Sequence, residues 1–159
     1  MNITIKDENN RFGVRVCAII YNQDKTKIFM QKQEDKDFYM FPGGRLEINE
    51  ETLPAIKREL KEELGIESDI YLKYIVESFI DFTNKFYHEL GFYFITTIPK
   101  EKLSDGCNSN DRSEINSIFE WVDIDKLNEI NILPNGIKEK IILKDTSKNI
   151  EHLVYKENL

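Results

Sequence analysis

The sequence predicts an α/β protein, and three observations lead to that class. Four stretches are apolar or rich in β-branched and aromatic residues, as buried strands are: residues 14–21, 27–33, 66–82 and 86–97. Residues 54–65 show helical periodicity and end at a glycine, and a second helix is expected from Pro134 to about Leu143. A length of 159 residues suits one domain over residues 1–159 with a single sizeable core.

The first strands are expected to form a hairpin. Residues 2–6 alternate enough for a short strand, and a polar turn follows before the buried strand 14–21. Residues 27–33 return as its hairpin partner. The side chains of Arg15 and of residues 31–33 face either a substrate cleft or solvent, and the solvent-facing position is the simpler interpretation.

The second half begins with residues 66–82, read as two strands or one bent strand, and a turn leads into 86–97. His88 and Glu89 are neighbours there, so their side chains face opposite sides of the sheet. We expect Glu89 to line a cleft and His88 to be a hydrogen-bonded or edge histidine. After the polar loop 99–113, residues 119–122 form a strand, Asp123 can cap a short helix to Asn128, and the tail 145–159 can add an edge strand.

Composition limits the class of function. The chain is 40% hydrophobic and 32% charged, as soluble globular proteins are, and its net charge of −7 argues against binding long nucleic acid. Cys17 lies in an apolar run and Cys107 in a polar loop, which argues against a disulfide framework. The N-terminal residues lack the apolar core of a signal peptide, and no run reaches membrane-spanning length. We therefore expect a cytoplasmic protein with no membrane partner.

The first helix carries the chemistry. Glu59, Glu62 and Glu63 fall within about 100° of arc on one helical face, while the lysines of the helix point elsewhere. Crowded carboxylates repel one another, and a hard divalent cation relieves that repulsion. Mg²⁺ suits such oxygen ligands and shares itself with substrate phosphates. The alternative, a solvated acidic helix, explains neither the neighbouring glycines nor the apolar stripe.

The spacing of this segment resembles the Nudix box, with no departure from its pattern. The matching residues are Gly44, Glu50, Arg58, Glu59, Leu60, Glu62, Glu63, Gly65 and Ile66. The resemblance implies a Nudix fold, in which a mixed β-sheet is sandwiched between helices (α/β/α). It also implies hydrolysis of a diphosphate linkage in a nucleoside triphosphate or a nucleoside diphosphate derivative. The expected cofactor is Mg²⁺, with Mn²⁺ as a substitute, and water attacks at phosphorus.

The resemblance also assigns roles to individual residues. The Gly43 carbonyl would join Glu59, Glu62 and Glu63 as metal ligands. Arg58 would orient Glu50 or Glu59 through a two-pronged ion pair. Further positions that the resemblance suggests are Glu47 in the loop before the box glutamate, Glu114 and then Glu120 as an additional ligand or base, and Asn135 as a reader of a purine edge. Trp121 either stacks a base or belongs to the core, and the core is favoured.

Several points stay open at this level. The general base is Glu62, Glu63 or Glu114, and the number of metal ions, the group attached to the diphosphate and the oligomeric state (a homodimer included) are not determined. A non-catalytic nucleotide-sensing module is an alternative function, against which the complete set of acids argues. An isomerase acting on an isoprenoid diphosphate is a third, but neither Cys17 nor Cys107 is evidently placed for it.

Overall fold

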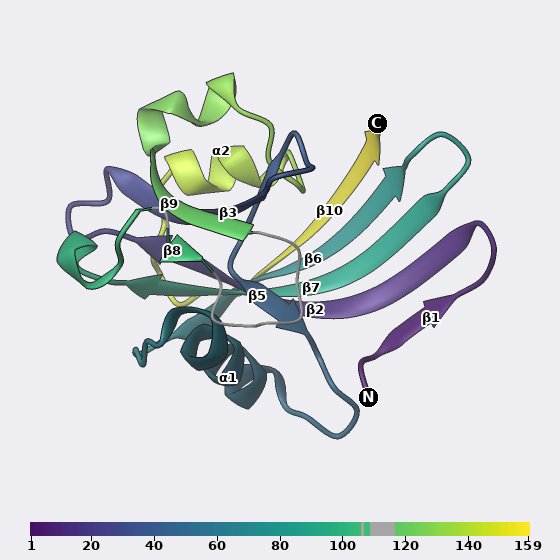
Figure 1. The fold of residues 1–159 in the computed structure, drawn as a ribbon, viewed down its shortest axis with the longest axis horizontal. Coiled ribbons are helices and arrows are strands. Elements are labelled where there is room, and N and C mark those ends of the chain that lie inside the picture. The colour runs from purple at the N-terminus through teal and green to yellow at the C-terminus, as the bar shows by residue number, and fades with distance from the viewer. Residues whose placement is uncertain (106, 109–116) are drawn as a thin grey trace.

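A mixed sheet forms the centre of the computed structural model, which describes residues 1–105, 107–108 and 117–159. Helix α1 covers one face of the sheet, and α2 lies on the other face (Figure 1). The predicted α/β/α arrangement is confirmed. The strands are β1 (Thr4–Lys6), β2 (Asn10–Tyr21), β3 (Lys27–Gln33), β4 (Tyr39–Met40), β5 (Gly43–Arg45), β6 (Tyr71–Asp81), β7 (Phe86–Thr97), β8 (Cys107–Asn108), β9 (Ser117–Asp123) and β10 (Glu151–Asn158).

The helices differ from the prediction mainly at their ends. Helix α1 spans Thr52–Leu64, and Gly65 ends it in the left-handed region at φ 66°, where its N–H is donated to the last-turn carbonyls. Helix α2 (Ile137–Ile142) is shorter than predicted, and the described residues also contain two 3₁₀ turns, η1 (Lys100–Lys102) and η2 (Ile124–Glu129). Asp123 precedes η2 but makes no cap, because its carboxylate pairs with Lys27.

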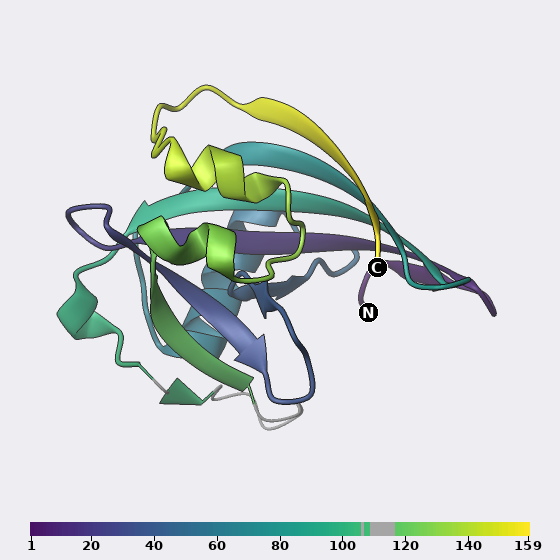
Figure 2. The ribbon, with the colours of Figure 1, turned by 90° about the horizontal axis from the view of Figure 1, so that it is seen from above.

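The strand order is β10-β6-β7-β2-β3-β9-β8, with β1 and β5 paired to β2 and β4 paired to β3. Strands β6 and β7 form an antiparallel hairpin, and β6 is one strand with an irregularity near Leu72, so the bent-strand alternative holds. Strands β2 and β7 lie parallel over twelve residue pairs, and β10 runs parallel to β6 (Figure 2). The expected edge strand in the tail is therefore present, as a parallel one.

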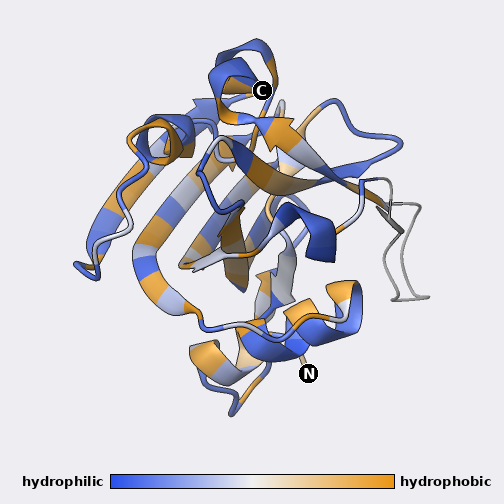
Figure 3. Ribbon diagram, turned by 90° about the vertical axis from the view of Figure 1, so that its left-hand side faces the viewer, coloured by the Kyte–Doolittle hydropathy of each residue, from blue (hydrophilic) through white to orange (hydrophobic). Residues whose placement is uncertain are grey.

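Two apolar layers hold the helices to the sheet. Alternate residues of β2 face opposite sides, so Val16 and Ala18 pack with α1 while Ile19 and Tyr21 pack with α2. Figure 3 shows the resulting alternation of hydrophobic and hydrophilic residues along the strands. Within the described part of the chain, no helix combines the length and apolar character that crossing a membrane requires.

One buried cation ties the segment after α2 to the sheet. The ammonium of Lys73, on β6, is fully buried and donates hydrogen bonds to Asp145 Oδ2 at 3.0 Å, Ser147 Oγ at 3.0 Å and the Asn149 carbonyl at 2.9 Å. These three bonds satisfy all its donors. They hold the chain that leads into β10 against the sheet edge.

Candidate active site

A cleft of about 630 Å³ lies where α1, β5 and the outer halves of β2 and β7 meet. Seven of the residues predicted for the site line it: Arg15, Gly43, Arg58, Glu59, Glu62, Glu63 and Glu89. Glu59, Glu62 and Glu63 lie on α1, whereas Arg15 and Glu89 come from neighbouring strands of the sheet. The fold thus joins a helix rich in acids to a polar strip of the sheet in one cavity.

The two turn glycines are needed for close approach. Gly43 has φ 145°, and a Cβ there would overlap the Val16 carbonyl oxygen of the neighbouring strand. A Cβ on Gly44 would overlap the carboxylate of Glu59. Side chains at these positions would therefore separate β5 from β2 or push Glu59 out of its place against β5.

Arg58 gathers the carboxylates around itself. Its Nε and Nη2 donate to the two oxygens of Glu50 at 2.7 and 3.0 Å, a bidentate pair. Its Nη1 donates to Glu59 Oε1 at 2.9 Å and to Glu62 Oε2 at 3.2 Å. The expected pairing with Glu50 or Glu59 is found with both at once. The lysines of α1 take no part in this network among the described residues.

Burial sets the electrostatics of Glu59. Its side chain is only 13% exposed, and this burial raises the pKa of its carboxyl, while Arg58 and, further off, Arg15 act in the opposite direction. Glu63 lies one turn further along α1, where its Oε2 accepts a hydrogen bond from the Gly43 N–H at 3.3 Å. The glycine turn and the helix are thus linked directly.

The donor chemistry of these residues fits a hard divalent cation, because carboxylate oxygens on α1 meet the backbone of the glycine turn. Among the described residues, however, no three Asp, Glu, His or Cys side chains are grouped so that they could hold a metal ion. Arg58 accounts for this, since it draws oxygens of Glu59 and Glu62 toward its guanidinium. Binding a cation would require those carboxylates to turn from Arg58.

The sheet side of the cleft contains a second polar group, centred on Arg15. Its Nη2 donates to the Phe41 carbonyl at 3.4 Å. Burial acts to lower the pKa of Arg15, but Cys17, Glu89 and Tyr93 outweigh it and raise the pKa. Burial also raises the pKa of the Cys17 thiol to about 11. Arg15 therefore stays cationic inside the cleft, and the solvent-facing interpretation of this residue is wrong.

Of the other predicted positions, some lie outside the cleft and some line it. Asn135 is exposed and outside the cleft, and its N–H is donated to Glu157. Glu120 accepts the Tyr39 hydroxyl, and Trp121 belongs to the core, where its Nε1 donates to the Leu103 carbonyl at 2.8 Å. Glu47 borders the cleft. The remaining candidate, Glu114, lies outside the described residues. Of residues 31–33, Gln31 and Gln33 line the cleft, and Gln31 is buried and hydrogen-bonded to Ser117.

Sequence reasoning missed Ser78 and Tyr93, which line the cleft on the same sheet face as Glu89. Ser78 lies opposite Glu89 in the register of β6 and β7. Tyr93 lies four residues after Glu89 on β7, so it shares the same face. The period of two, counted from Glu89, was a signal that pointed to Tyr93.

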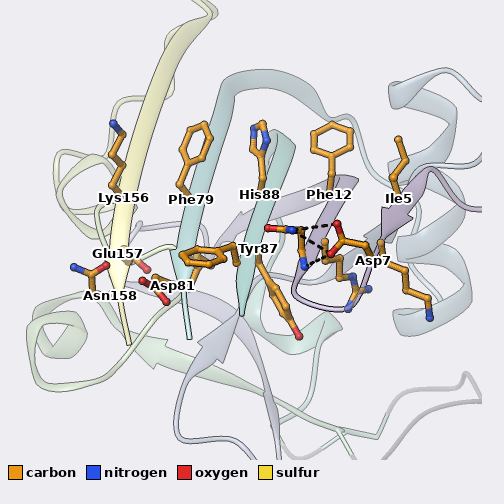
Figure 4. A pocket seen from close by; sticks show the side chains of 15 residues that line it. Ile5, Asp7, Phe12, Phe79, Asp81, Tyr87, His88, Lys156, Glu157 and Asn158 are labelled. Carbon is orange, nitrogen blue, oxygen red and sulfur yellow. Dashed lines mark hydrogen bonds between the residues drawn. The ribbon is translucent and has the colours of Figure 1, made fainter. Parts of the chain in front are cut away.

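A second hollow, of about 540 Å³, lies at the far end of the sheet and contains none of the α1 acids (Figure 4). A row of side chains crosses five strands there, each opposite the next in register: Ile5, Phe12, His88, Phe79 and Lys156. The His88 ring stacks on Phe79 at 4.3 Å and meets the edge of Phe12 at 4.9 Å. His88 therefore has a packing role, through ring contacts rather than the expected hydrogen bond.

Comparisons with known proteins agree with this geometry. A family model described as the NUDIX domain matches residues 11–143. The 8-oxo-dGTP diphosphatase of Buchnera aphidicola subsp. Schizaphis graminum is 30% identical over 112 residues, which cover 67% of this chain and 75% of that protein. The dihydroneopterin triphosphate diphosphatase of Escherichia coli K12 is 34% identical over 64 residues, 40% of this chain and 43% of that protein.

Solved structures share the fold. The MutT protein from Bacillus halodurans superposes with a TM-score of 0.69 at 20% identity, covering 91% of this chain and 89% of that one. The dihydroneopterin triphosphate pyrophosphohydrolase of E. coli superposes with a TM-score of 0.61 at 19% identity, covering 83% of this chain and 96% of that one.

Proposed function

The chain belongs to the NUDIX family and is a pyrophosphohydrolase of that family, and on this premise we propose that residues 1–159 act as one domain on a small nucleotide-type substrate. The reaction is metal-dependent hydrolysis of a diphosphate linkage by attack of water at phosphorus. The observation that carries the proposal is the cleft, in which the acids of α1 and a polar strip of the sheet, formed by Arg15 and Glu89, line the same cavity. The phosphates of the substrate would lie beside the acids of α1, and the group attached to them would lie along the strip on the sheet.

A nucleoside triphosphate is the substrate we favour. The compounds named for the two relatives, 8-oxo-dGTP and dihydroneopterin triphosphate, are both triphosphates. Their ring systems also share one edge, on which an amino group, a ring N–H and a carbonyl follow one another. A cavity of about 630 Å³ is within the usual range of roughly 300–1,000 Å³ for small-molecule sites.

The cofactor we propose is a divalent cation such as Mg²⁺, for which Mn²⁺ would substitute. Glu59, Glu62, Glu63 and the Gly43 carbonyl would hold it, and it would supply charge neutralisation at the phosphates and polarisation of a water molecule. Arg58 orients Glu59 and holds Glu50 beside it through the hydrogen bonds described above. These bonds gather the carboxylates on one side of the cleft, and Glu59 and Glu62 would turn from Arg58 to bind the cation.

The proton of the attacking water goes to a glutamate carboxylate, which acts as general base. Glu62, Glu63 and Glu114 are the candidates. As the new phosphorus–oxygen bond forms, the bridging phosphorus–oxygen bond breaks, and the leaving phosphate or pyrophosphate departs with its electron pair.

The test is release of phosphate and pyrophosphate from a panel of nucleoside triphosphates, ADP-ribose and diadenosine polyphosphates, measured with and without Mg²⁺. We expect turnover of at least one triphosphate that disappears with a chelator and returns with the cation. Tight nucleotide binding without turnover of any compound would contradict the proposal and favour a sensing module.

A further inference from the structure

Glu89 and Arg15 lie on a part of the sheet where neighbouring residues are small. In the register of β2 and β7, Glu89 is opposite Gly13, and Arg15 is opposite Gly91. On its other side Glu89 faces Ser78 of β6. Because glycine has no side chain and serine a short one, the sheet beside Glu89 forms a low floor at Gly13 and Ser78, whereas the Tyr93 ring covers Gly91. Such a floor admits a flat ring close to the sheet.

Aromatic side chains bound this floor at both ends. The Tyr93 ring lies over Gly91, where an added Cβ would come within 2.6 Å of it, and it meets Phe41 edge to face at 5.5 Å. At the outer end Tyr87 and Phe82 are in edge contact at 5.0 Å. All four line the same cleft. Apolar rings at the two ends and a polar floor between them suit a heterocycle with one hydrogen-bonding edge.

The charged pair on the floor has unused hydrogen-bonding capacity. Glu89 is half-buried, and no described residue donates a hydrogen bond to its carboxylate. Arg15 has five N–H donors, yet its one backbone bond, to Phe41, is long at 3.4 Å. It also bonds the Cys17 thiol, and it interacts with Glu89 and Tyr93 through its charge. Half-buried charged groups are costly when they lack partners, so a ligand that supplies donors to Glu89 and an acceptor to Arg15 would be favoured.

We propose that Glu89 determines substrate specificity by accepting two hydrogen bonds from adjacent N–H donors of a heterocycle, with Arg15 donating to the neighbouring carbonyl. The ligand class is therefore a ring with a 2-amino-4-oxopyrimidine edge, as guanine has. Glu89 is opposite Gly13 of β2, and Arg15 lies two residues, or roughly 6–7 Å, further along that strand. The ring would therefore meet Glu89 with its amino group and ring N–H, and Arg15 with its carbonyl. This inference rests on the proposed function, because it places the ring in the cleft whose acids face the phosphates.

A carboxylate and an amide of the same shape favour different edges. Two carboxylate oxygens match the ring N–H and amino group of guanine, whereas a glutamine offers one oxygen and one NH₂. The glutamine matches xanthine, whose edge has the same ring N–H but a carbonyl in place of the amino group. Hypoxanthine keeps the ring N–H but lacks the amino group of guanine. The difference between the guanine and hypoxanthine substrates therefore measures the contribution of the hydrogen bond from that amino group.

The experiment compares kcat/KM for dGTP, dITP and dXTP with Mg²⁺, in wild type and in Glu89→Gln. We expect wild type to prefer dGTP over dITP and dXTP by about 10–100-fold, the usual discrimination of a bidentate contact. Glu89→Gln should lose that preference and favour dXTP over dGTP. A variant that keeps the wild-type order of the three substrates would overturn the inference.

The matched control is Glu77→Gln, on the adjacent strand β6. Glu77 lies outside the cleft and pairs with His152 at 2.7 Å, so the three ratios should stay at wild-type values. If wild type hydrolyses no compound of the panel, the proposed function fails. In that case, or if it hydrolyses only compounds other than triphosphates, the inference is tested by calorimetric binding of dGMP, dIMP and dXMP. Preference for dGMP that Glu89→Gln abolishes would support it, and equal binding of the three by wild type would refute it.

Discussion

Replacing Arg58 with alanine tests how much the helix depends on its central cation. The substitution removes the bidentate pair with Glu50, in which the Arg58 side chain is 30% exposed and the Glu50 side chain 18% exposed. Hydrogen bonds to charged groups contribute about 1.5–3 kcal/mol when buried, while exposed ion pairs contribute about 0.2–1 kcal/mol. Because this pair is partly screened but well oriented, we expect the free energy of unfolding at neutral pH to fall by about 1–2 kcal/mol.

The loss should depend on pH in a defined direction. The hydrogen bonds from Arg58 lower the pKa of Glu50 in the folded state. A carboxyl with a lowered folded pKa stabilises the protein above its unfolded pKa, and this contribution is lost as the pH falls through the folded pKa. The difference between wild type and Arg58→Ala should therefore be largest at neutral pH and shrink in acid, where Glu50 is protonated in both proteins.

Denaturant unfolding at a series of pH values measures this directly. The control is Lys57→Ala, which removes one positive charge from the same turn of α1 at an exposed position. We expect it to change the free energy of unfolding by less than about 0.5 kcal/mol at every pH. Turnover should fall about 10–100-fold in Arg58→Ala, which is the usual effect of removing a residue that orients a metal ligand through a hydrogen bond. Equal stability losses for the two variants, independent of pH, would refute the reasoning.

The remaining predictions concern the acids, the glycine turn and the buried lysine. Glu62→Gln and Glu63→Gln should each lower turnover with Mg²⁺ by more than about 100-fold, and near-normal turnover would remove them from the metal site. Gly43→Ala should destabilise the protein by more than about 3 kcal/mol, since the new Cβ overlaps a strand carbonyl. Gly65→Ala should cost only about 1 kcal/mol, because its Cβ meets no atom within 4 Å, and equal denaturation midpoints for the two variants would contradict this. Lys73→Met should lower the free energy of unfolding by about 2–4 kcal/mol while leaving kcat unchanged, because three hydrogen bonds are lost far from the cleft, and an unchanged midpoint would argue against the buried network.

Local patterns were enough to predict several of the elements that carry the site, although not strand β5 or the first residues of β2. The bounds of β3 and β7 match the predicted ranges, and Gly65 ends α1 as expected, because turn residues and a helix-terminating glycine act over a few residues. The cluster of box residues also follows from spacing along one helix, since positions three and four apart share a face.

Features set by distant contacts could not be predicted in the same way. The parallel pairing of β2 with β7 depends on which strands share a core, and local sequence does not encode it. For Arg15 the sequence leaves a cleft-facing and a solvent-facing position open, because a charged residue in an alternating strand is usually exposed to solvent. Burial of Lys73 likewise depends on Asp145 and its neighbours, which lie about 75 residues away in the chain.

The parallel pairing of the central strands has a consequence for synthesis. Asn10 of β2 pairs with Phe86 of β7, 76 residues later, and β2 meets β3 at only two residue pairs. At translation rates of about 5–20 residues per second, β2 leaves the ribosome about 4–15 s before its main neighbour. Its apolar segment stays without that neighbour for this interval, exposed to other nascent chains. Soluble yield should therefore respond to growth temperature and chaperone supply even in variants whose finished fold is as stable as wild type.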